Sequence, residues 1–130
     1  MIVDSSVLIA ILKRELEAQG FSKILDQSQS SSMSAANYLE TSIVVDGWKD
    51  PVLSNRLDEI IDRFSIAIEP VTPEQAKIAR QAYQNFGKGR GNRANLNFGD
   101  CFSYALAKDK RESILFKGDD FKYTDLRSAV

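Results

Sequence analysis

The first twelve residues constrain the fold most, because they join a strand to a helix through one charged residue. Residues 1–3 form an apolar run that ends abruptly at Asp4, and a second apolar run covers 7–12. Continuous apolar runs are typical of strands in parallel sheets, and open α/β folds bind ligands at the carboxyl ends of such strands. We therefore expect Asp4 where such a fold does its chemistry, beside a helix that Ser5 or Ser6 caps. The structural alternative is that Asp4 itself only caps that helix.

The rest of the chain alternates between strand-like and helix-like segments. Strands are predicted from apolar or β-branched runs, helices from apolar residues three and four apart, and breaks from Pro and Gly. We expect further strands at 66–71 and 113–117, helices at 6–14, 15–25, 35–48, 51–64, 73–86 and 99–109, a loop or the edge of a short strand at 27–32, a loop at 87–95 and a turn at 118–120. This alternation, with no long linker, predicts a single domain over 1–130, a three-layer α/β/α sandwich with a mainly parallel sheet.

Composition excludes several kinds of chemistry. The chain has 130 residues, no histidine and one cysteine, Cys101. These counts exclude a Ser/His/Asp triad, a histidine zinc site, an internal disulfide and a cysteine zinc cluster. Any reaction must therefore use carboxylates, hydroxyls, Lys, Arg or Tyr. Seventeen basic and eighteen acidic residues give a net charge of −1, which favours no class of partner. The single cysteine and the lack of a long apolar run predict a soluble, cytoplasmic protein.

Glu40 stands on a largely apolar face of the predicted helix that carries it. Helical spacing stacks it with Asn37, Ile43, Val44 and Gly47. A carboxylate on an apolar face is unfavourable unless it is paired, hydrogen-bonded or bound to a metal. Glu40 is thus a functional candidate. The alternative is a side chain that reaches water from the edge of the apolar stripe.

Three more acids fall near the ends of predicted elements. Asp100 opens the helix expected at 99–109, where it either caps the helix or directs a carboxylate, beside Ser103, into the crevice at the end of the sheet. Asp119 and Asp120 follow the last predicted strand, where a turn is the structural alternative. Each acid alone is weak evidence for a site.

Together these acids predict one negatively charged pocket. Asp4, Asp119 and Asp120 fall at strand ends. Glu40 and Asp100 fall on helices that pack beside those ends. Four or more converging carboxylates repel one another and raise each other's pKa values unless a cation neutralises them. A hard divalent ion, Mg²⁺ or Mn²⁺, prefers oxygen ligands, activates water and stabilises charge on a phosphoryl group, so the predicted substrate is a phosphodiester.

A basic, glycine-rich loop fits the same substrate. Lys88, Arg90 and Arg93 lie among glycines shortly before Asp100. The loop lacks the pattern of a Walker A or dinucleotide-binding motif, but its cations can hold the phosphate backbone of a nucleic acid beside the acids. The alternative is an ordinary exposed loop. Three aromatic residues near it are predicted to stack on bases: Tyr83, Phe86 and Phe98.

Four stretches of the chain carry a family resemblance. They are Ile-Val-Asp-Ser-Ser at 2–6, Ser-Ala-Ala-Asn-Tyr-Leu-Glu-Thr at 34–41, the run from 87 to 107 with Leu-Asn-Phe-Gly-Asp-Cys-Phe at 96–102, and Leu-Phe-Lys-Gly-Asp-Asp-Phe at 115–121. Together they resemble the PIN-domain family, and specifically its VapC-type toxin ribonucleases. The resemblance implies a compact α/β/α domain that cleaves RNA endonucleolytically with Mg²⁺ or Mn²⁺. It also implies a homodimer, inhibited by a co-expressed antitoxin whose segment occupies the active-site groove.

The resemblance also implies roles for individual residues. Asp4 and Asp100 match the principal metal ligands of the family, and Glu40 matches its third acid. Ser6 matches the hydroxyl that supports the first aspartate.

The fourth acid stays open between two neighbours. The residue just before Phe121 is usually Asp in the subgroup that the chain resembles, which favours Asp120. Asp119 is adjacent and could reach the same metal.

Two functions from other classes also stay open. A phospho-acceptor signalling domain is an α/β protein with a Mg²⁺-binding acid pocket, in which Lys117 would contact the phosphate. Its acidic pair is expected near the first strand, whereas the pair here comes near the last. A non-catalytic RNA-binding module would use the carboxylates only as helix caps.

Overall fold

A parallel sheet of four strands lies at the centre of the protein, which the computed structural model describes over residues 1–130. The strands are β1 (Ile2–Val3), β2 (Ser31–Ser34), β3 (Ile66–Glu69) and β4 (Ile114–Leu115). They lie in the order β3-β2-β1-β4, and every neighbouring pair is parallel. All four carboxyl ends therefore meet at one end of the sheet.

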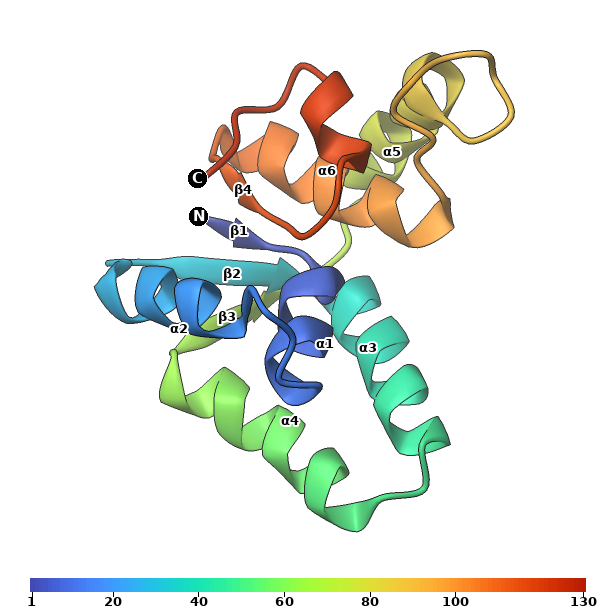
Figure 1. Ribbon diagram of the computed structural model, residues 1–130. Helices are drawn as coiled ribbons and strands as arrows, with labels where there is room; N and C mark the ends of the chain where they lie inside the picture. The colour runs from blue at the N-terminus through green and yellow to red at the C-terminus, as the bar shows by residue number, and fades with distance from the viewer.

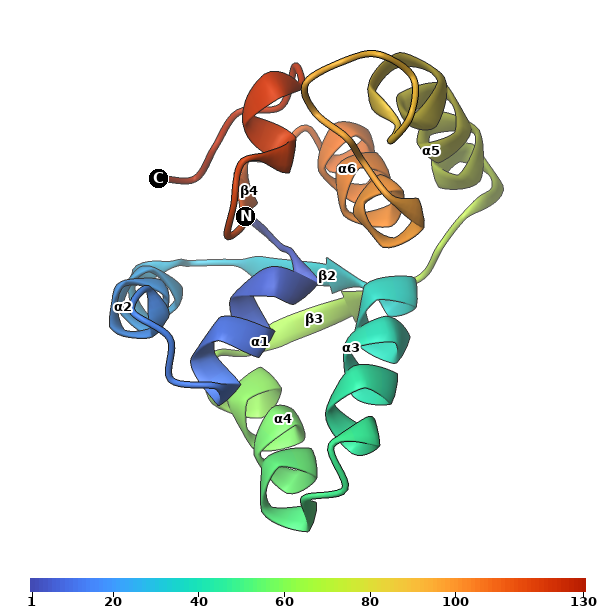
Figure 2. The same cartoon turned by 45° about the vertical axis from the view of Figure 1, so that its right-hand side comes forward.

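Helices cover both faces of this sheet (Figures 1 and 2). One layer holds α1 (Ser5–Leu12), α2 (Ala18–Gln27), α3 (Ala35–Gly47) and α4 (Pro51–Arg63). The opposite layer holds α5 (Pro73–Phe86), α6 (Phe98–Lys110) and the short 3₁₀ helix η1 (Asp120–Tyr123). The predicted three-layer α/β/α sandwich with a parallel sheet is confirmed.

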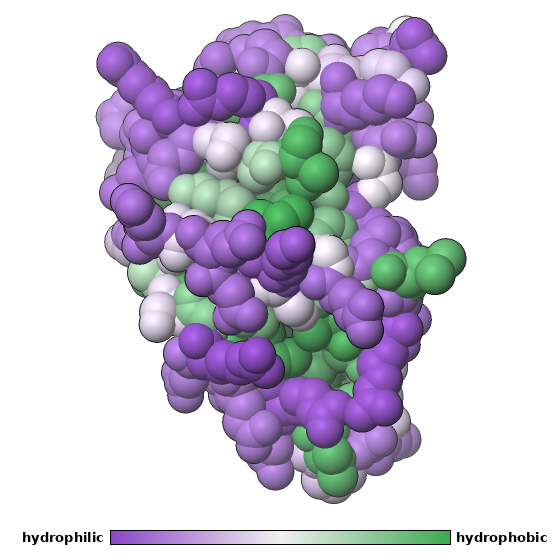
Figure 3. Space-filling model, turned by 60° about the vertical axis from the view of Figure 1, so that its left-hand side comes forward, coloured by the Kyte–Doolittle hydropathy of each residue, from purple (hydrophilic) through white to green (hydrophobic).

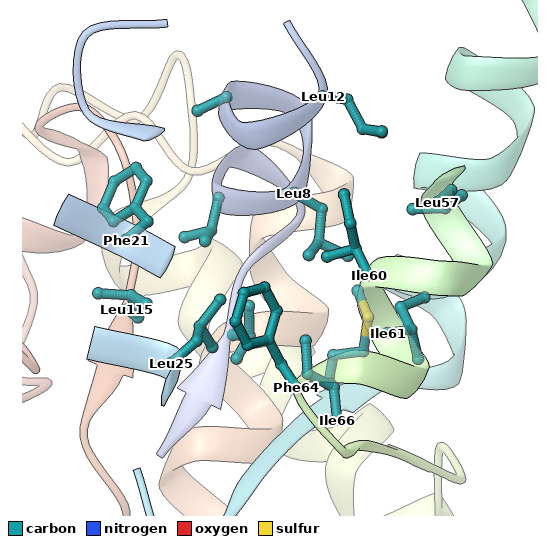
Figure 4. Packing of buried hydrophobic residues seen from close by; sticks show 14 of the residues in the cluster. Leu8, Leu12, Phe21, Leu25, Leu57, Ile60, Ile61, Phe64, Ile66 and Leu115 are labelled. Carbon is teal, nitrogen blue, oxygen red and sulfur yellow. The ribbon is translucent and has the colours of Figure 1, made fainter. Parts of the chain in front are cut away.

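The alternation of side chains along the short strands divides the hydrophobic core into two. In β1, Ile2 packs with residues of α5 and α6, while Val3 packs with residues of α1, α2 and α4. Ile114 and Leu115 of β4 divide in the same way. Figure 4 shows the larger core, in which α1, α2 and α4 close over one face of the sheet. Strands of two residues suffice here because both of their faces are covered.

The second helix begins later than its sequence pattern predicts. It was expected at 15–25, but α2 spans Ala18–Gln27. The preceding helix, α1, ends at Leu12, and Arg14 adopts a left-handed backbone conformation with φ 54°. This turn separates the two helices and delays the start of α2.

The serine-rich segment after α2 is an interior strand, where the sequence predicted a loop or the edge of a short strand. This strand, β2, lies between β1 and β3, and all four of its residues are buried. Ser34 at its end also caps α3, since its hydroxyl accepts a hydrogen bond from the Ala36 nitrogen (3.2 Å). Polar side chains that are short enough to bury hide this strand from a pattern based on apolar runs.

Two other strands are shorter than predicted. β3 ends at Glu69, one residue before Pro70, whose nitrogen has no hydrogen to donate to a sheet. β4 covers only Ile114–Leu115 of the predicted 113–117. Gly118 then makes the predicted turn with φ 96° and leads into η1.

Hydrophilic side chains cover most of the surface in the view of Figure 3, and apolar side chains show in smaller areas between them. This pattern is expected of helices that bury one face against a sheet. None of the helices is both long and apolar enough to cross a membrane.

Candidate active site

Asp4 follows β1 at the carboxyl end of the sheet and is 5% exposed. Its Oδ2 accepts hydrogen bonds from the backbone nitrogen of Ser6 (3.1 Å) and from the Ser6 hydroxyl (2.6 Å). Asp4 is therefore the N-cap of α1, and the prediction that Ser5 or Ser6 caps this helix is wrong. Capping uses only the Oδ2 oxygen of Asp4. The other oxygen, Oδ1, accepts a hydrogen bond from the hydroxyl of Ser103 in α6 (2.6 Å). Asp4 thus links the two helix layers.

Ser6 holds Asp4 in place from the side of β4. Its hydroxyl donates to Asp4 Oδ2 and accepts from the backbone nitrogen of Lys117 (2.9 Å). A backbone N–H only donates, so the proton of Ser6 points to the aspartate. This is the contact expected of a residue that supports the first aspartate.

Asp100 lies in the first turn of α6 but does not cap it. Asn97 is the cap: its side chain accepts from the Asp100 nitrogen (2.9 Å), and Asp100 accepts from the Asn97 nitrogen in return (3.0 Å). The capping alternative for Asp100 is thereby corrected. Burial raises the pKa of Asp100 from 3.8 to about 7; the bond from Asn97 opposes this rise, and the charges of Asp4, Asp120 and Glu40 add to it. Three of the other predicted acids are therefore close enough to act on Asp100.

Glu40 reaches the other acids from α3. Its Oε1 accepts from the Ser5 hydroxyl (3.1 Å), and its carboxylate lies against Gly99 of α6, where an added Cβ would overlap it. With Glu40 in this rotamer, only glycine at position 99 leaves room for the carboxylate. Ile43 and Val44, which share the face of Glu40, are exposed. Glu40 is thus at the border of an exposed apolar surface and not on a buried stripe.

Of the two neighbouring acids after β4, Asp120 faces the others. Burial raises the pKa of Asp120, and the charges of Asp4 and Asp119 raise it further. The charge of Asp120 also contributes to the raised pKa of Asp100, whereas that of Asp119 does not. Asp120 is therefore the nearer of the two to the other acids.

Four carboxylates converge at this end of the sheet, and we call them the acid cluster: Asp4, Glu40, Asp100 and Asp120. None of them has a cationic partner. The ion pairs of the protein lie elsewhere: Met1 with Glu112, Lys108 with Asp125, and Lys117 with Glu15 and Glu17. A concentration of carboxylates without a cation suits a hard divalent ion, which prefers oxygen ligands. In their present rotamers no three of the acidic side chains are grouped so that they could hold an ion, so binding requires some of them to rotate.

Two buried polar residues connect the acid cluster, and the sequence indicated them only as neighbours of the acids. The Ser103 hydroxyl, 0% exposed, lies 2.6 Å from Asp4 Oδ1 and 3.0 Å from Asn37 Oδ1. Asn37 Nδ2 donates to the Gly99 carbonyl (2.9 Å). The signal available in the sequence is spacing, because Asn37 precedes Glu40 and Ser103 follows Asp100 by three residues, which is about one helical turn.

The basic loop is folded against α5 and η1. Arg90 donates to the backbone carbonyl of Gln84 (3.3 Å) and lies 6.0 Å from the ring centre of Tyr83. Arg93 donates to the Tyr123 hydroxyl (3.3 Å) and lies over its ring at 4.3 Å. This places Arg93 beside η1, whose first residue belongs to the acid cluster. Both arginines and Lys88 are exposed, and none forms an ion pair.

Aromatic residues near the acid cluster differ in what they can contact. Phe98 is 79% exposed and packs edge-on against Phe102 (4.8 Å between ring centres). It stands between two apolar grooves, one of about 440 Å³ between α5 and α6, which Tyr83 also lines, and one of about 310 Å³ between α3 and α6. Phe86 packs instead against Tyr104 of the smaller core (5.8 Å between ring centres) and is only partly exposed, so less of its ring is open to a base.

Comparison with known sequences identifies the family. The family model of the PIN domain matches residues 1–126. The chain belongs to the PIN-domain family. Ribonuclease VapC28 of Mycobacterium tuberculosis is 50% identical to this PIN domain over 130 residues, which cover 100% of this chain and 98% of that one.

Solved structures share the fold of this PIN domain at low sequence identity. VapC20 of Mycobacterium tuberculosis, a toxin that cleaves the sarcin-ricin loop, superposes with a TM-score of 0.74 at 16% identity, covering 96% of this chain and 95% of that one. A toxin–antitoxin complex from Klebsiella pneumoniae gives a TM-score of 0.72 at 14% identity, with coverages of 95% and 92%. Both support the assigned fold.

Lys117 of this PIN domain does not contact the acid cluster with its side chain. Its ammonium pairs with Glu15 and Glu17, between α1 and α2. The phospho-acceptor alternative needs a free lysine beside the acids, so this pairing and the family assignment both speak against it.

Proposed function

We propose that this PIN domain is a Mg²⁺- or Mn²⁺-dependent endoribonuclease, the toxin of a toxin–antitoxin system, with residues 1–130 as one nuclease domain. The acid cluster carries the proposal, because it brings four carboxylates from both helix layers to one end of a parallel sheet with no cationic partner. The naming of VapC28 as a ribonuclease, at 50% identity over the whole chain, supports RNA as the substrate.

Within this proposal Asp4 and Asp100 hold the cation, and Glu40 and Asp120 complete its negative surroundings. We assign Asp120 as the fourth acid because its charge acts on Asp100 and that of Asp119 does not. A bound Mg²⁺ or Mn²⁺ supplies a water of lowered pKa and stabilises negative charge on the phosphate. The protein keeps Asp4 in a fixed position: its backbone ends β1, and its Oδ2 is held by Ser6.

The cations of the basic loop hold the RNA strand. Lys88, Arg90 and Arg93 are exposed and unpaired, so their charge is available to phosphates. Arg93 has a fixed direction, because it is anchored on the Tyr123 ring beside η1. Tyr83 remains as an exposed ring that can stack on bases.

RNA cleavage by the purified protein tests the proposal directly. We expect cleavage with Mg²⁺ or Mn²⁺, none in excess EDTA, and none by Asp4→Ala, which removes a cation ligand. Lys110→Ala, at the far end of α6, serves as the matched surface control and should cleave normally. RNA that binds equally in EDTA and is never cut would identify a non-catalytic RNA-binding module. Equal cleavage by Asp4→Ala would exclude the assigned site.

We also propose that a protein antitoxin inhibits the enzyme by covering the acid cluster. The similarity in fold to a chain of a toxin–antitoxin complex from Klebsiella pneumoniae supports such a partner. A protein encoded by a gene next to that of this chain should copurify with it when the two are co-expressed. It should also suppress RNA cleavage by the wild type. A copurified protein that leaves cleavage unchanged would contradict this assignment.

Finally, we propose that two copies pair through the exposed apolar face of α3 and α6. Leu39 and Ile43 are 59% and 63% exposed, and Phe98 projects between the two apolar grooves. The face therefore carries a projection and a recess together, as a self-complementary twofold interface requires. Sedimentation should show a dimer that Ile43→Asp converts to a monomer. Leu16→Asp, at a leucine 98% exposed in the connection between α1 and α2, should stay dimeric, and a monomeric wild type would refute the proposal.

A further inference from the structure

Two buried acceptors compete for the one hydroxyl proton of Ser103. Its hydroxyl lies 2.6 Å from Asp4 Oδ1 and 3.0 Å from Asn37 Oδ1. A hydroxyl carries a single hydrogen, so it donates to one of these oxygens at a time. No other donor contacts either oxygen. All three residues are at most 5% exposed.

The orientation of the Asn37 amide is fixed by its other contact. The Gly99 carbonyl, 2.9 Å away, only accepts hydrogen bonds, so Nδ2 faces Gly99 and Oδ1 faces Ser103. A flipped amide would place Asn37 Oδ1 against the Gly99 carbonyl oxygen, and these two acceptors could form no hydrogen bond. Asn37 therefore presents Ser103 with an acceptor and never with a donor.

The competition has an unfavourable consequence in the protein alone. When Ser103 donates to Asp4, Asn37 Oδ1 is a buried acceptor without a donor. When Ser103 donates to Asn37, Asp4 Oδ1 loses its bond. Leaving either oxygen unpaired is unfavourable. A cation on Asp4 Oδ1 would pair that oxygen and release the Ser103 proton to Asn37, so that both acceptors have partners.

We propose that Ser103 and Asn37 form a hydrogen-bond switch that exchanges a bond on Asp4 for a divalent cation. The inference rests on the proposed cation site at Asp4. Ser103 is a positioning residue, since it acts through Asp4 and touches neither RNA nor the reacting water. As the cation binds, the Ser103 hydroxyl rotates from Asp4 Oδ1 to Asn37 Oδ1; as the cation leaves, it rotates back. No covalent bond changes in this step.

The switch predicts a specific signal at Asn37. In carbon-13-labelled wild type, addition of Mg²⁺ should shift the resonance of the Asn37 side-chain carbonyl carbon, because its oxygen gains a hydrogen bond. In Ser103→Ala the shift should disappear although Mg²⁺ still binds. The affinity for Mg²⁺ should stay within about threefold of wild type, since the variant loses one donor from the free and the bound state alike.

A matched control separates the switch from general effects of a buried hydroxyl. Thr41 is also buried on α3, and its hydroxyl donates to the backbone carbonyl of Asn37 (2.7 Å) and not to its side chain. Thr41→Val should keep both the Mg²⁺ affinity and the Asn37 shift. A structural role for Ser103 alone would not make the shift depend on Mg²⁺.

A second pair of variants tests the exchange from the opposite side. Asn37→Leu removes the acceptor that takes the proton from Asp4, so it should weaken Mg²⁺ binding by about tenfold. Adding Ser103→Ala removes the competing donor and should restore the affinity. If Asn37→Leu does not fold, the carbonyl shift of the wild type and of Ser103→Ala decides the matter.

Each outcome has one meaning for the switch. An Asn37 carbonyl that does not shift at saturating Mg²⁺, or that shifts equally in Ser103→Ala, overturns it while leaving the cation site intact. A wild type that binds no Mg²⁺ overturns the switch and the proposed cation site together. Activity of the enzyme enters none of these readouts.

Discussion

Two acids, one in the first turn of α6 and one in the C-terminal segment packed against this helix, have opposite electrostatics. In the first turn, Asp100 meets the rest of the acid cluster, while Asp125 accepts hydrogen bonds from Tyr104 (2.6 Å) and Lys108 in the second half of the helix. Burial acts to raise the pKa of both acids. At Asp125 the bonds from Lys108 and Tyr104 outweigh burial, and its pKa falls. At Asp100 the neighbouring carboxylates add to burial, and its pKa rises to about 7.

The contrast shows that burial alone does not separate a structural acid from a functional one. The difference lies in whether a cation of the chain is present. Asp125 forms a complete ion pair that ties the C-terminal segment to α6. Asp100 stands among carboxylates, and no cation of the chain pairs with it. Neutralising Asp100 should therefore lower activity and cation binding far more than neutralising Asp125. The two substitutions should change stability with opposite signs.

The largest difference is expected in RNA cleavage. Asp100→Asn should lower the rate by about a hundredfold or more, because it removes a cation ligand. The substitution leaves an oxygen that still accepts from the Asn97 nitrogen, so the start of α6 is kept. Asp125→Asn should leave the rate near that of wild type. Timed digestion of one RNA by equal amounts of the folded variants measures both, and a similar loss in the two would contradict the contrast.

Cation-dependent stability is the next effect in size. Mn²⁺ at about a hundred times its dissociation constant should stabilise the wild type by about 2.7 kcal/mol, which appears as a higher melting temperature. Asp100→Asn should lose most of this gain, and Asp125→Asn should keep it. Thermal unfolding with Mn²⁺ and with EDTA provides the measurement. Equal stabilisation of all three proteins would place the cation elsewhere.

Without a cation, the same two substitutions should change stability with opposite signs. The folded pKa of Asp100, about 7, exceeds its ordinary value of 3.8, so the folded state binds more protons between these values and stability falls as the pH rises through them. In EDTA, Asp100→Asn should therefore stabilise the protein by about 1 kcal/mol near pH 8, after allowance for partial exposure, and by less near pH 5.

Substitution of Asp125 should change stability in the opposite direction from substitution of Asp100. Its folded pKa lies below the ordinary value, so its stabilising effect is present above about pH 4 and is lost only at lower pH. Asp125→Asn should destabilise the protein by up to about 1 kcal/mol near both pH 5 and pH 8. Chemical unfolding at the two pH values measures the pair. Destabilisation by Asp100→Asn in EDTA would show that the acid cluster is already balanced.

The sequence predicted the acid cluster better than the surfaces around it, for a physical reason. Parallel strands bring their carboxyl ends together, so acids after β1 and β4 had to meet, whatever the details of the loops. The choice between Asp119 and Asp120 depends on the backbone of one turn and needed the structure. The cap of α1 also needed it, since Asp4 performs the role that was expected of the serines.

The pattern of apolar residues failed to predict burial in two opposite ways. Ile43 and Val44 follow Glu40 by three and four residues, the spacing of core residues on one helix face, yet they are exposed. The serines of β2 suggest a loop, yet the strand is interior and buried. Spacing shows which residues share a face, but it does not show what covers that face. Only the packing of the other elements answers that question.

The smallest expected effect concerns RNA binding by the basic loop, where the acid cluster plays no part. Arg93→Ala should weaken RNA binding in EDTA by about threefold and reduce the slope of log affinity against log salt by about 0.7, the value for one phosphate of a single strand. The effect is modest because Arg93 is exposed and is one of three loop cations. Lys110→Ala is the matched control, since it removes another exposed cation, from the end of α6 where Asp125 is paired. Fluorescence anisotropy at several salt concentrations measures both slopes, and equal slopes would mean that RNA does not follow the loop beside the acid cluster.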